Sequence, residues 1–191
     1  SGRGAFDSLN EYIAKGNPAD SLALLYDTLM VTSADEPFTQ YGLLAEQVEY
    51  PVDRSWIIFH LRTDAYFSDG HAIDTEDVVF SYELLLEKGS PIYQFYYQDV
   101  TSVEALDAQR VKFTFRQSNN RELPLIMGEL PVLPKHFWEG KEFDKGSLEI
   151  PLGSGPYTIK EVDAGRNITY ERNANYWGRY LSVNNGLYNF D

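Results

Sequence analysis

The chain has 191 residues, enough for one large domain or two small ones, and no apolar run approaches the roughly 20 residues of a membrane-spanning helix. Its formal net charge of −13 and its scattered Lys and Arg argue against a nucleic-acid partner, because a phosphate-binding surface needs clustered basic residues. The absence of cysteine excludes disulfides, thiolate metal ligands and cysteine nucleophiles.

The N-terminal part of the chain predicts a helix followed by a hairpin. Residues 20–30 carry apolar side chains at helical spacing, with Asp20 in the N-cap position. Residues 46–50 and 55–62 flank a Pro-Val-Asp-Arg turn, which predicts a β-hairpin. Apolar side chains recur at every second position of its second strand, so we expect one face in the core and the other partly covered.

A tight turn and a capped helix are predicted next. Gly70 follows Asp69 where the chain must reverse, since glycine tolerates a positive φ. Asp74 is placed to cap a helix, and Asp77 stands three residues later in the position of a capping-box acid. The apolar residues behind them repeat at helical spacing, and a Lys-Gly-Ser-Pro stretch around Gly89 predicts the end of this helix.

The rest of the chain adds two more hairpins and short helices. Residues 100–106 and 110–116 predict a hairpin, and a further hairpin begins near Gly153. Residues 120–130 predict a helix and residues 134–138 a helical turn. The aromatic segment IYQFYY precedes them, and core packing is the expected role for most of its rings. The predicted fold is a mixed α/β (α+β) domain with a largely antiparallel sheet and packed helices on one side.

The sequence predicts binding rather than catalysis. The three histidines, His60, His71 and His136, show no metal-ligand spacing, so we expect no metal site. The chain contains neither a nucleophile elbow nor a phosphate-binding loop, and we expect no catalytic residue and no cofactor. Acidity and an aromatic content of 15% leave open a carbohydrate-active protein, either a glycosidase or a sugar-binding module. A third reading is an interaction module that docks a membrane partner.

Four stretches resemble segments of the bacterial extracellular solute-binding proteins of family 5, the oligopeptide- and dipeptide-binding type. They are TLM followed by YGLLAEQVEY, WIIFHLRTDAYFSDGHAIDTEDVVFSYELL, GSGPYTIKE and ERNANYWG, and together they cover nearly the whole chain. Finer features, among them FDSLN near the start and VNNGLYNFD at the end, most resemble the Yej-type branch, which is associated with oligopeptide and microcin C uptake.

The resemblance implies a monomeric, non-enzymatic receptor in the periplasm, or lipid-anchored outside the cytoplasmic membrane. Such a receptor closes two lobes around a peptide or peptide-like ligand and delivers it to an ABC permease. Members of the family are much longer, so we expect this chain to be a fragment of a periplasmic-binding-protein type II-like lobe. Residues 1–33 and 150–191 would be parts of the first lobe, and residues 34–149 a subdomain inserted into it.

The same resemblance places the candidate ligand-binding residues in two short segments. One comprises Phe6, Asp7, Ser8, Leu9 and Asn10, and the other Gly155, Pro156 and Tyr157. The stretch from Trp56 to Leu86 is the most recognisable, but we expect it to lie in the inserted subdomain, away from the peptide.

Overall fold

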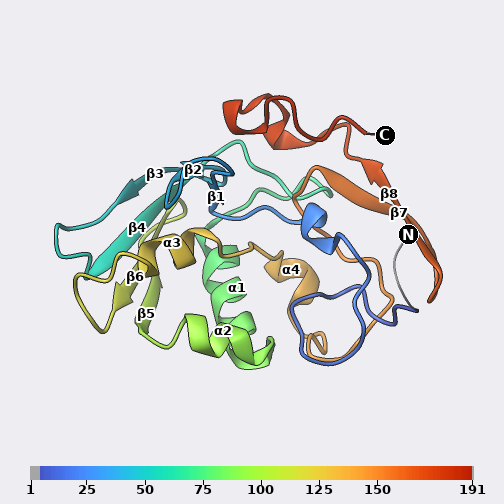
Figure 1. The fold of residues 1–191 in the computed structure, drawn as a ribbon, viewed down its shortest axis with the longest axis horizontal. Helices are drawn as coiled ribbons and strands as arrows, with labels where there is room; N and C mark the ends of the chain where they lie inside the picture. The colour runs from blue at the N-terminus through green and yellow to red at the C-terminus, as the bar shows by residue number, and fades with distance from the viewer. Residues whose placement is uncertain (1–4, 191) are drawn as a thin grey trace.

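A four-stranded antiparallel sheet organises the middle of the chain in the computed structural model, which describes residues 5–190 (Figure 1). Its strand order is β3-β4-β6-β5, so two hairpins lie side by side. The strands are β3 (Ala45–Glu49), β4 (Trp56–Leu61), β5 (Val100–Ala105) and β6 (Arg110–Phe115). Side chains of β4 alternate between half-buried and buried along the whole strand. Both predicted hairpins, and the predicted partial cover on the second face of β4, are confirmed.

The capped helix follows as predicted. Helix α1 (Thr75–Lys88) begins after Asp74, whose side chain accepts hydrogen bonds from the backbone N–H of Glu76 and Asp77. The Asp77 carboxylate accepts in return from the Asp74 N–H, which completes the capping box. The helix packs on the buried face of the sheet, where Tyr82 meets Phe113 with ring centroids 5.7 Å apart.

Three shorter helices complete this part of the fold. They are α2 (Pro91–Tyr96), α3 (Leu123–Gly128) and α4 (Lys135–Trp138). The helical turn predicted at residues 134–138 is confirmed, whereas α3 is shorter than the predicted 120–130. Asn120 accounts for the later start, because its side-chain oxygen accepts from the N–H of Glu122 and Leu123 before the helix begins. No helix within residues 5–190 is long and apolar enough to cross a membrane.

The predicted helix at residues 20–30 is wrong. Only a 3₁₀ turn, η1 (Leu22–Leu25), forms there, and Ser21 before it has φ 67°. The chain then runs extended into β1 (Met30–Thr32), which pairs with β2 (Gln40–Gly42). The helical spacing correctly marked buried side chains, but the Leu25 carbonyl accepts from Gly155 N–H instead of closing a helical turn.

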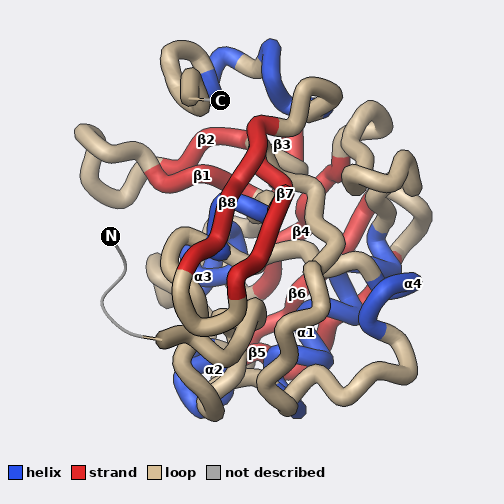
Figure 2. Tube along the Cα trace, turned by 90° about the vertical axis from the view of Figure 1, so that its right-hand side faces the viewer, coloured by secondary structure: helices blue, strands red, loops and turns tan. Residues whose placement is uncertain are grey.

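The third predicted hairpin is confirmed and lies against the N-terminal segment. It comprises β7 (Tyr157–Asp163) and β8 (Asn167–Arg172), which cross the front of the molecule in Figure 2. The 3₁₀ turns η2 (Trp177–Tyr180) and η3 (Ser182–Asn184) follow. Strand β7 contacts η1, and the hydroxyl of Tyr170 donates to the Asp20 carbonyl over 2.5 Å. The two ends of the chain therefore form one packed unit beside the four-stranded sheet.

Candidate functional site

A cavity of about 400 Å³, here called the tyrosine pocket, opens between the N-terminal segment, α2 and the chain after α3. Five tyrosines and two glutamates give it an aromatic and acidic lining. The lining residues are Glu11, Tyr12, Ala23, Tyr26, Thr28, Tyr93, Tyr96, Tyr97, Ile126, Glu129 and Pro131.

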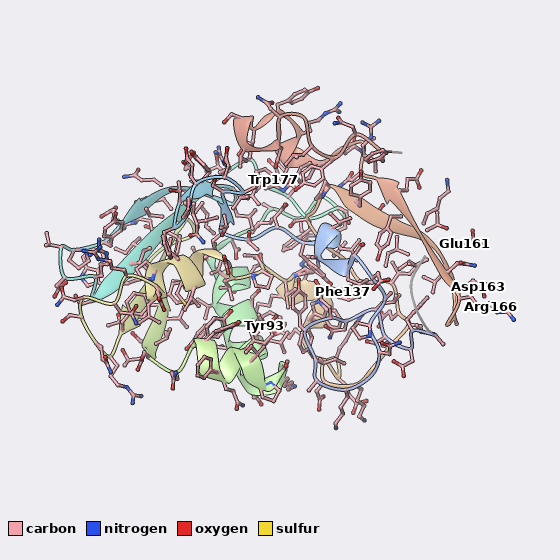
Figure 3. All side chains as sticks on the ribbon, in the orientation of Figure 1. Tyr93, Phe137, Glu161, Asp163, Arg166 and Trp177 are labelled. Atoms are coloured by element: carbon pink, nitrogen blue, oxygen red, sulfur yellow. The ribbon has the colours of Figure 1, made fainter. Side chains whose placement is uncertain are left out.

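Helix α2 and the N-terminal loop hold the rings of this pocket in a connected series. Tyr93 in α2 and Tyr97, the residue that caps its C-terminus, lie one helical turn apart, with ring centroids separated by 5.9 Å (Figure 3 labels Tyr93). Tyr12 packs against Tyr93 at 6.4 Å and against Tyr26 at 5.5 Å. The Ser90 N–H donates to the Tyr12 carbonyl over 2.7 Å, which fixes the loop to the start of α2. The rings are thus positioned before any ligand arrives.

The electrostatics of the tyrosine pocket favour a cationic group. Burial, together with the nearby Glu11 charge, raises the pKa of Tyr93 to about 12, so this phenol stays neutral near pH 7. Burial also raises the pKa of Glu11, while a hydrogen bond with Tyr12 opposes the shift. Neutral aromatic faces beside carboxylates attract an ammonium or guanidinium group through cation–π and charge-assisted contacts.

The predicted segment Phe6–Asn10 is mostly buried and adjoins this pocket without lining it. Ser8 is fully buried, and its hydroxyl accepts from the Asn10 N–H. The Asn10 side chain donates to the Phe143 carbonyl and accepts from the Tyr12 N–H, each over 3.0 Å. Asp7 is exposed and accepts from the Asn17 N–H. The segment therefore positions Tyr12, and its own contact with ligand stays a prediction.

The second predicted group lies elsewhere. Gly155 donates its N–H to the Leu25 carbonyl over 2.9 Å, and the hydroxyl of Tyr157 donates to the Phe190 carbonyl over 3.0 Å. Pro156 lines a smaller cavity of about 260 Å³ together with Tyr176 and other residues near the C-terminal end. Neither predicted segment lines the tyrosine pocket. The sequence did carry a signal for the pocket, the aromatic run at residues 92–97, although core packing is the role that the sequence predicts for most of its rings.

Comparison with known proteins identifies the family. The sequence profile of the bacterial extracellular solute-binding proteins, family 5 (middle part), matches residues 39–191. The chain belongs to this family. It is 46% identical to the probable peptide-binding protein YejA of Agrobacterium fabrum, over 98% of this chain and 31% of that protein. It is also 41% identical to the peptidoglycan-binding protein YepA of the same organism, over 98% of this chain and 32% of that protein.

Solved structures confirm the fold of this family 5 chain. A periplasmic oligopeptide-binding protein of an ABC transporter from Thermotoga maritima superposes with a TM-score of 0.78 at 24% identity, covering 94% of this chain and 33% of that one. The chain thus spans about a third of the length of the relatives it matches. The predicted family, its Yej-type branch and the mixed α/β fold are confirmed, and the comparisons give no support for the carbohydrate alternative.

Two of the stretches that carry the family resemblance meet at one buried carboxylate. Asp27 is 3% exposed and accepts from the hydroxyl of Tyr176 and the indole N–H of Trp177, each over 2.9 Å (Figure 3 labels Trp177). The Ser154 hydroxyl accepts from the Asp27 N–H over 3.2 Å. Burial raises the pKa of Asp27 to about 7, although its hydrogen bonds with Tyr176, Trp177 and Ser154 oppose the shift. The GSGPY and YW motifs therefore have a structural role here.

Proposed function

We propose that the chain is part of the substrate-binding component of an ABC importer. This component captures oligopeptides or peptide-like solutes in the periplasm, or lipid-anchored outside the cytoplasmic membrane, and delivers them to a membrane permease. It acts as a monomer and catalyses no reaction. The observation that carries the proposal is the 46% identity, over nearly the whole chain, to a relative named as a probable peptide-binding protein.

The proposal keeps the predicted division of the chain. Residues 1–33 and 150–191 contribute to one lobe, and residues 34–149 form a subdomain inserted into it. Contacts between the two ends of the chain support this division, among them the Asp27 hydrogen bonds to Tyr176 and Trp177. The tyrosine pocket takes its lining from residues on both sides of the proposed boundary at residue 33.

Within this function, the tyrosine pocket receives a cationic group of the ligand, such as a lysine or arginine side chain or an amino terminus. Support comes from Glu11 and Glu129 beside five tyrosine rings. Glu129 accepts from the Thr32 hydroxyl over 2.7 Å, outside the pocket lining, whereas Glu11 forms its hydrogen bond with Tyr12, a residue of the pocket itself, so Glu11 is the carboxylate chosen for the test.

Calorimetry on the intact protein tests the function and the pocket separately. Two tripeptide pools are matched except that one contains lysine where the other contains norleucine. Each pool is titrated into wild type, Glu11→Gln and the exposed control Glu104→Gln. We expect peptide binding by wild type and about a five- to thirtyfold loss of affinity for lysine peptides in E11Q, corresponding to about 1–2 kcal/mol. Norleucine peptides and the E104Q variant should show little change.

The outcomes distinguish two failures. If the intact protein binds no peptide and no related cationic solute, the proposed function is wrong. If peptides bind and E11Q weakens lysine and norleucine peptides equally, the function stands and the assignment of the tyrosine pocket to a cationic group is wrong.

A further inference from the structure

Three potential metal-ligand atoms converge on the surface near the turn at residue 70. The Asp69 Oδ2 atom lies 2.8 Å from Nδ1 of His71 and 2.8 Å from Nε2 of His136. The two imidazole rings stack with centroids 4.1 Å apart and an interplanar angle of 26°. All three ligand atoms lie within 4.8 Å of one another.

The surrounding backbone holds these side chains in place. Gly70 has φ 91° in the turn, and the N–H of Phe67 donates to the carbonyl of His71 over 2.9 Å. The His71 N–H donates to Asp69 Oδ1 over 3.1 Å, so the other carboxylate oxygen faces both imidazoles. The ring of Phe67 packs edge-on against His136 at 5.6 Å. The site is therefore built before any ion arrives.

The start of α4 is also anchored independently of this cluster. The Lys135 N–H donates to Oδ1 of Asp77 over 2.9 Å, which ties α4 to the first turn of α1. His136 is the next residue, so the same contact limits how far its backbone can move. Two rigid elements thus supply the histidine ligands, and an ion between them would link the turn to α4.

We propose that Asp69, His71 and His136 form a binding site for a divalent transition-metal ion of the Zn²⁺ class. Two imidazoles and one carboxylate suit Zn²⁺, Ni²⁺ or Cu²⁺, whereas Ca²⁺ and Mg²⁺ prefer oxygen ligands alone. In a tetrahedral Zn²⁺ site, bonds of about 2.0–2.2 Å place neighbouring ligand atoms about 3.3–3.6 Å apart, so each 2.8 Å contact needs to open by about 0.5–0.8 Å.

The exposure of the cluster makes this an open site. The side chains of His71, His136 and Asp69 are 63%, 33% and 32% exposed in the described part of the chain. Three protein ligands leave one or more positions of the ion to water or a small solute. On binding, Nδ1 of His71 and Nε2 of His136 donate their lone pairs to the ion. The proton of each neutral ring then resides on its other nitrogen, and a protonated ring releases one proton to solvent.

The third histidine provides a matched control. His60 also pairs with one carboxylate, that of Glu49, but no second imidazole joins that pair among the clusters found in residues 5–190. A single imidazole with one carboxylate offers two ligands, which is too few for a comparable site. His60→Gln should therefore leave metal binding intact.

Calorimetric titration of ZnCl₂ alone into the intact, EDTA-stripped protein tests the site near neutral pH without peptide. We expect one saturable Zn²⁺ site in wild type and in H60Q. Loss of an outer-shell partner typically weakens metal binding about 10–100-fold, so H71Q, H136Q and Asp69→Asn, which each remove a direct ligand, should each lose at least about tenfold. Zn²⁺ should also raise Tm in wild type and H60Q more than in the three variants.

Circular dichroism establishes that each variant is folded, and D69N retains the amide oxygen that can accept from the His71 N–H. The proposal is overturned if wild type shows no saturable Zn²⁺ binding up to millimolar concentrations. It is also overturned if H71Q, H136Q and D69N bind Zn²⁺ as wild type does, or if Ca²⁺ binds as tightly as Zn²⁺. Because no peptide is present in this titration, none of these results bears on the proposed transport function.

Discussion

At the scale of single residues, Asp27 shows how a charge can serve packing rather than ligand binding. Its carboxylate is almost completely removed from water and has two side-chain donors, Tyr176 and Trp177. Burial outweighs these hydrogen bonds and raises the pKa from the ordinary 3.8 to about 7. The folded state therefore holds the proton more tightly than the unfolded state, and the stability linked to this group falls as pH rises from about 4 to about 7.

Asp27→Asn should remove this pH dependence. The amide cannot ionise, so the free energy of unfolding of wild type relative to D27N should fall by roughly 1–3 kcal/mol between about pH 5 and about pH 8. Urea unfolding at several pH values measures this difference, with the exposed substitution Asp64→Asn as the control. The assignment of a raised pKa to Asp27 would be contradicted if the free energy of unfolding changed with pH in the same way in wild type, D27N and D64N.

The metal-ligand cluster lies at the same scale, and the sequence could not predict it. His71 and His136 are 65 positions apart, so no ligand spacing links them along the chain. The expectation of no metal site rested on that spacing alone. The fold brings them together because the turn at Gly70 and the start of α4 both lie close to the N-terminus of α1.

At the scale of elements, prediction succeeded where hydrogen bonds close locally. The three hairpins and α1 satisfy their backbone groups within neighbouring residues, and turn and capping residues mark their ends. The helix expected at residues 20–30 failed because its backbone bonds to a distant segment, as Leu25 does to Gly155. The tyrosine pocket follows the same rule, since Tyr12 and Tyr93 meet from separate segments.

The capping residue Asp77 combines a local and a distant role, which leads to a graded prediction. Its side chain accepts from the N–H of Asp74 and, over 2.9 Å, from that of Lys135 in α4. Asp77→Ala leaves both donors without this partner and should cost at least about 2 kcal/mol, whereas Asp74→Ala, which removes only the cap, should cost about 1 kcal/mol. Chemical denaturation measures both.

Glu76→Ala is the matched control for this comparison. Glu76 lies in the same helical turn and forms an exposed ion pair with Lys135, so its loss should leave stability nearly unchanged. If D77A and D74A prove equally destabilising, the contact between Asp77 and the Lys135 N–H adds nothing to stability, and α4 is held by other contacts.

At the scale of the whole molecule, the two ends of the chain are joined by a backbone contact too close for any side chain. A Cβ atom at Gly153 would lie 1.8 Å from the Leu25 carbonyl oxygen, and one at Gly155 would lie 2.4 Å from that of Leu24. Glycine at both positions thus allows the segment 153–155 to lie directly on the backbone of the N-terminal segment. Ser154, between them, accepts from the Asp27 N–H in the same joint.

Gly153→Ala should therefore push the segment around residue 153 away from Leu25 and destabilise the protein by about 1–3 kcal/mol or more. The clash is with backbone, so no rotamer change relieves it. Gly146→Ala is the control, because its Cβ would meet atoms no nearer than 3.7 Å and should cost little or stabilise slightly. Thermal unfolding of both variants measures the difference. Similar Tm values for G153A and G146A would show that the two ends tolerate a wider separation, and the close contact would then carry little of the stability of the fold.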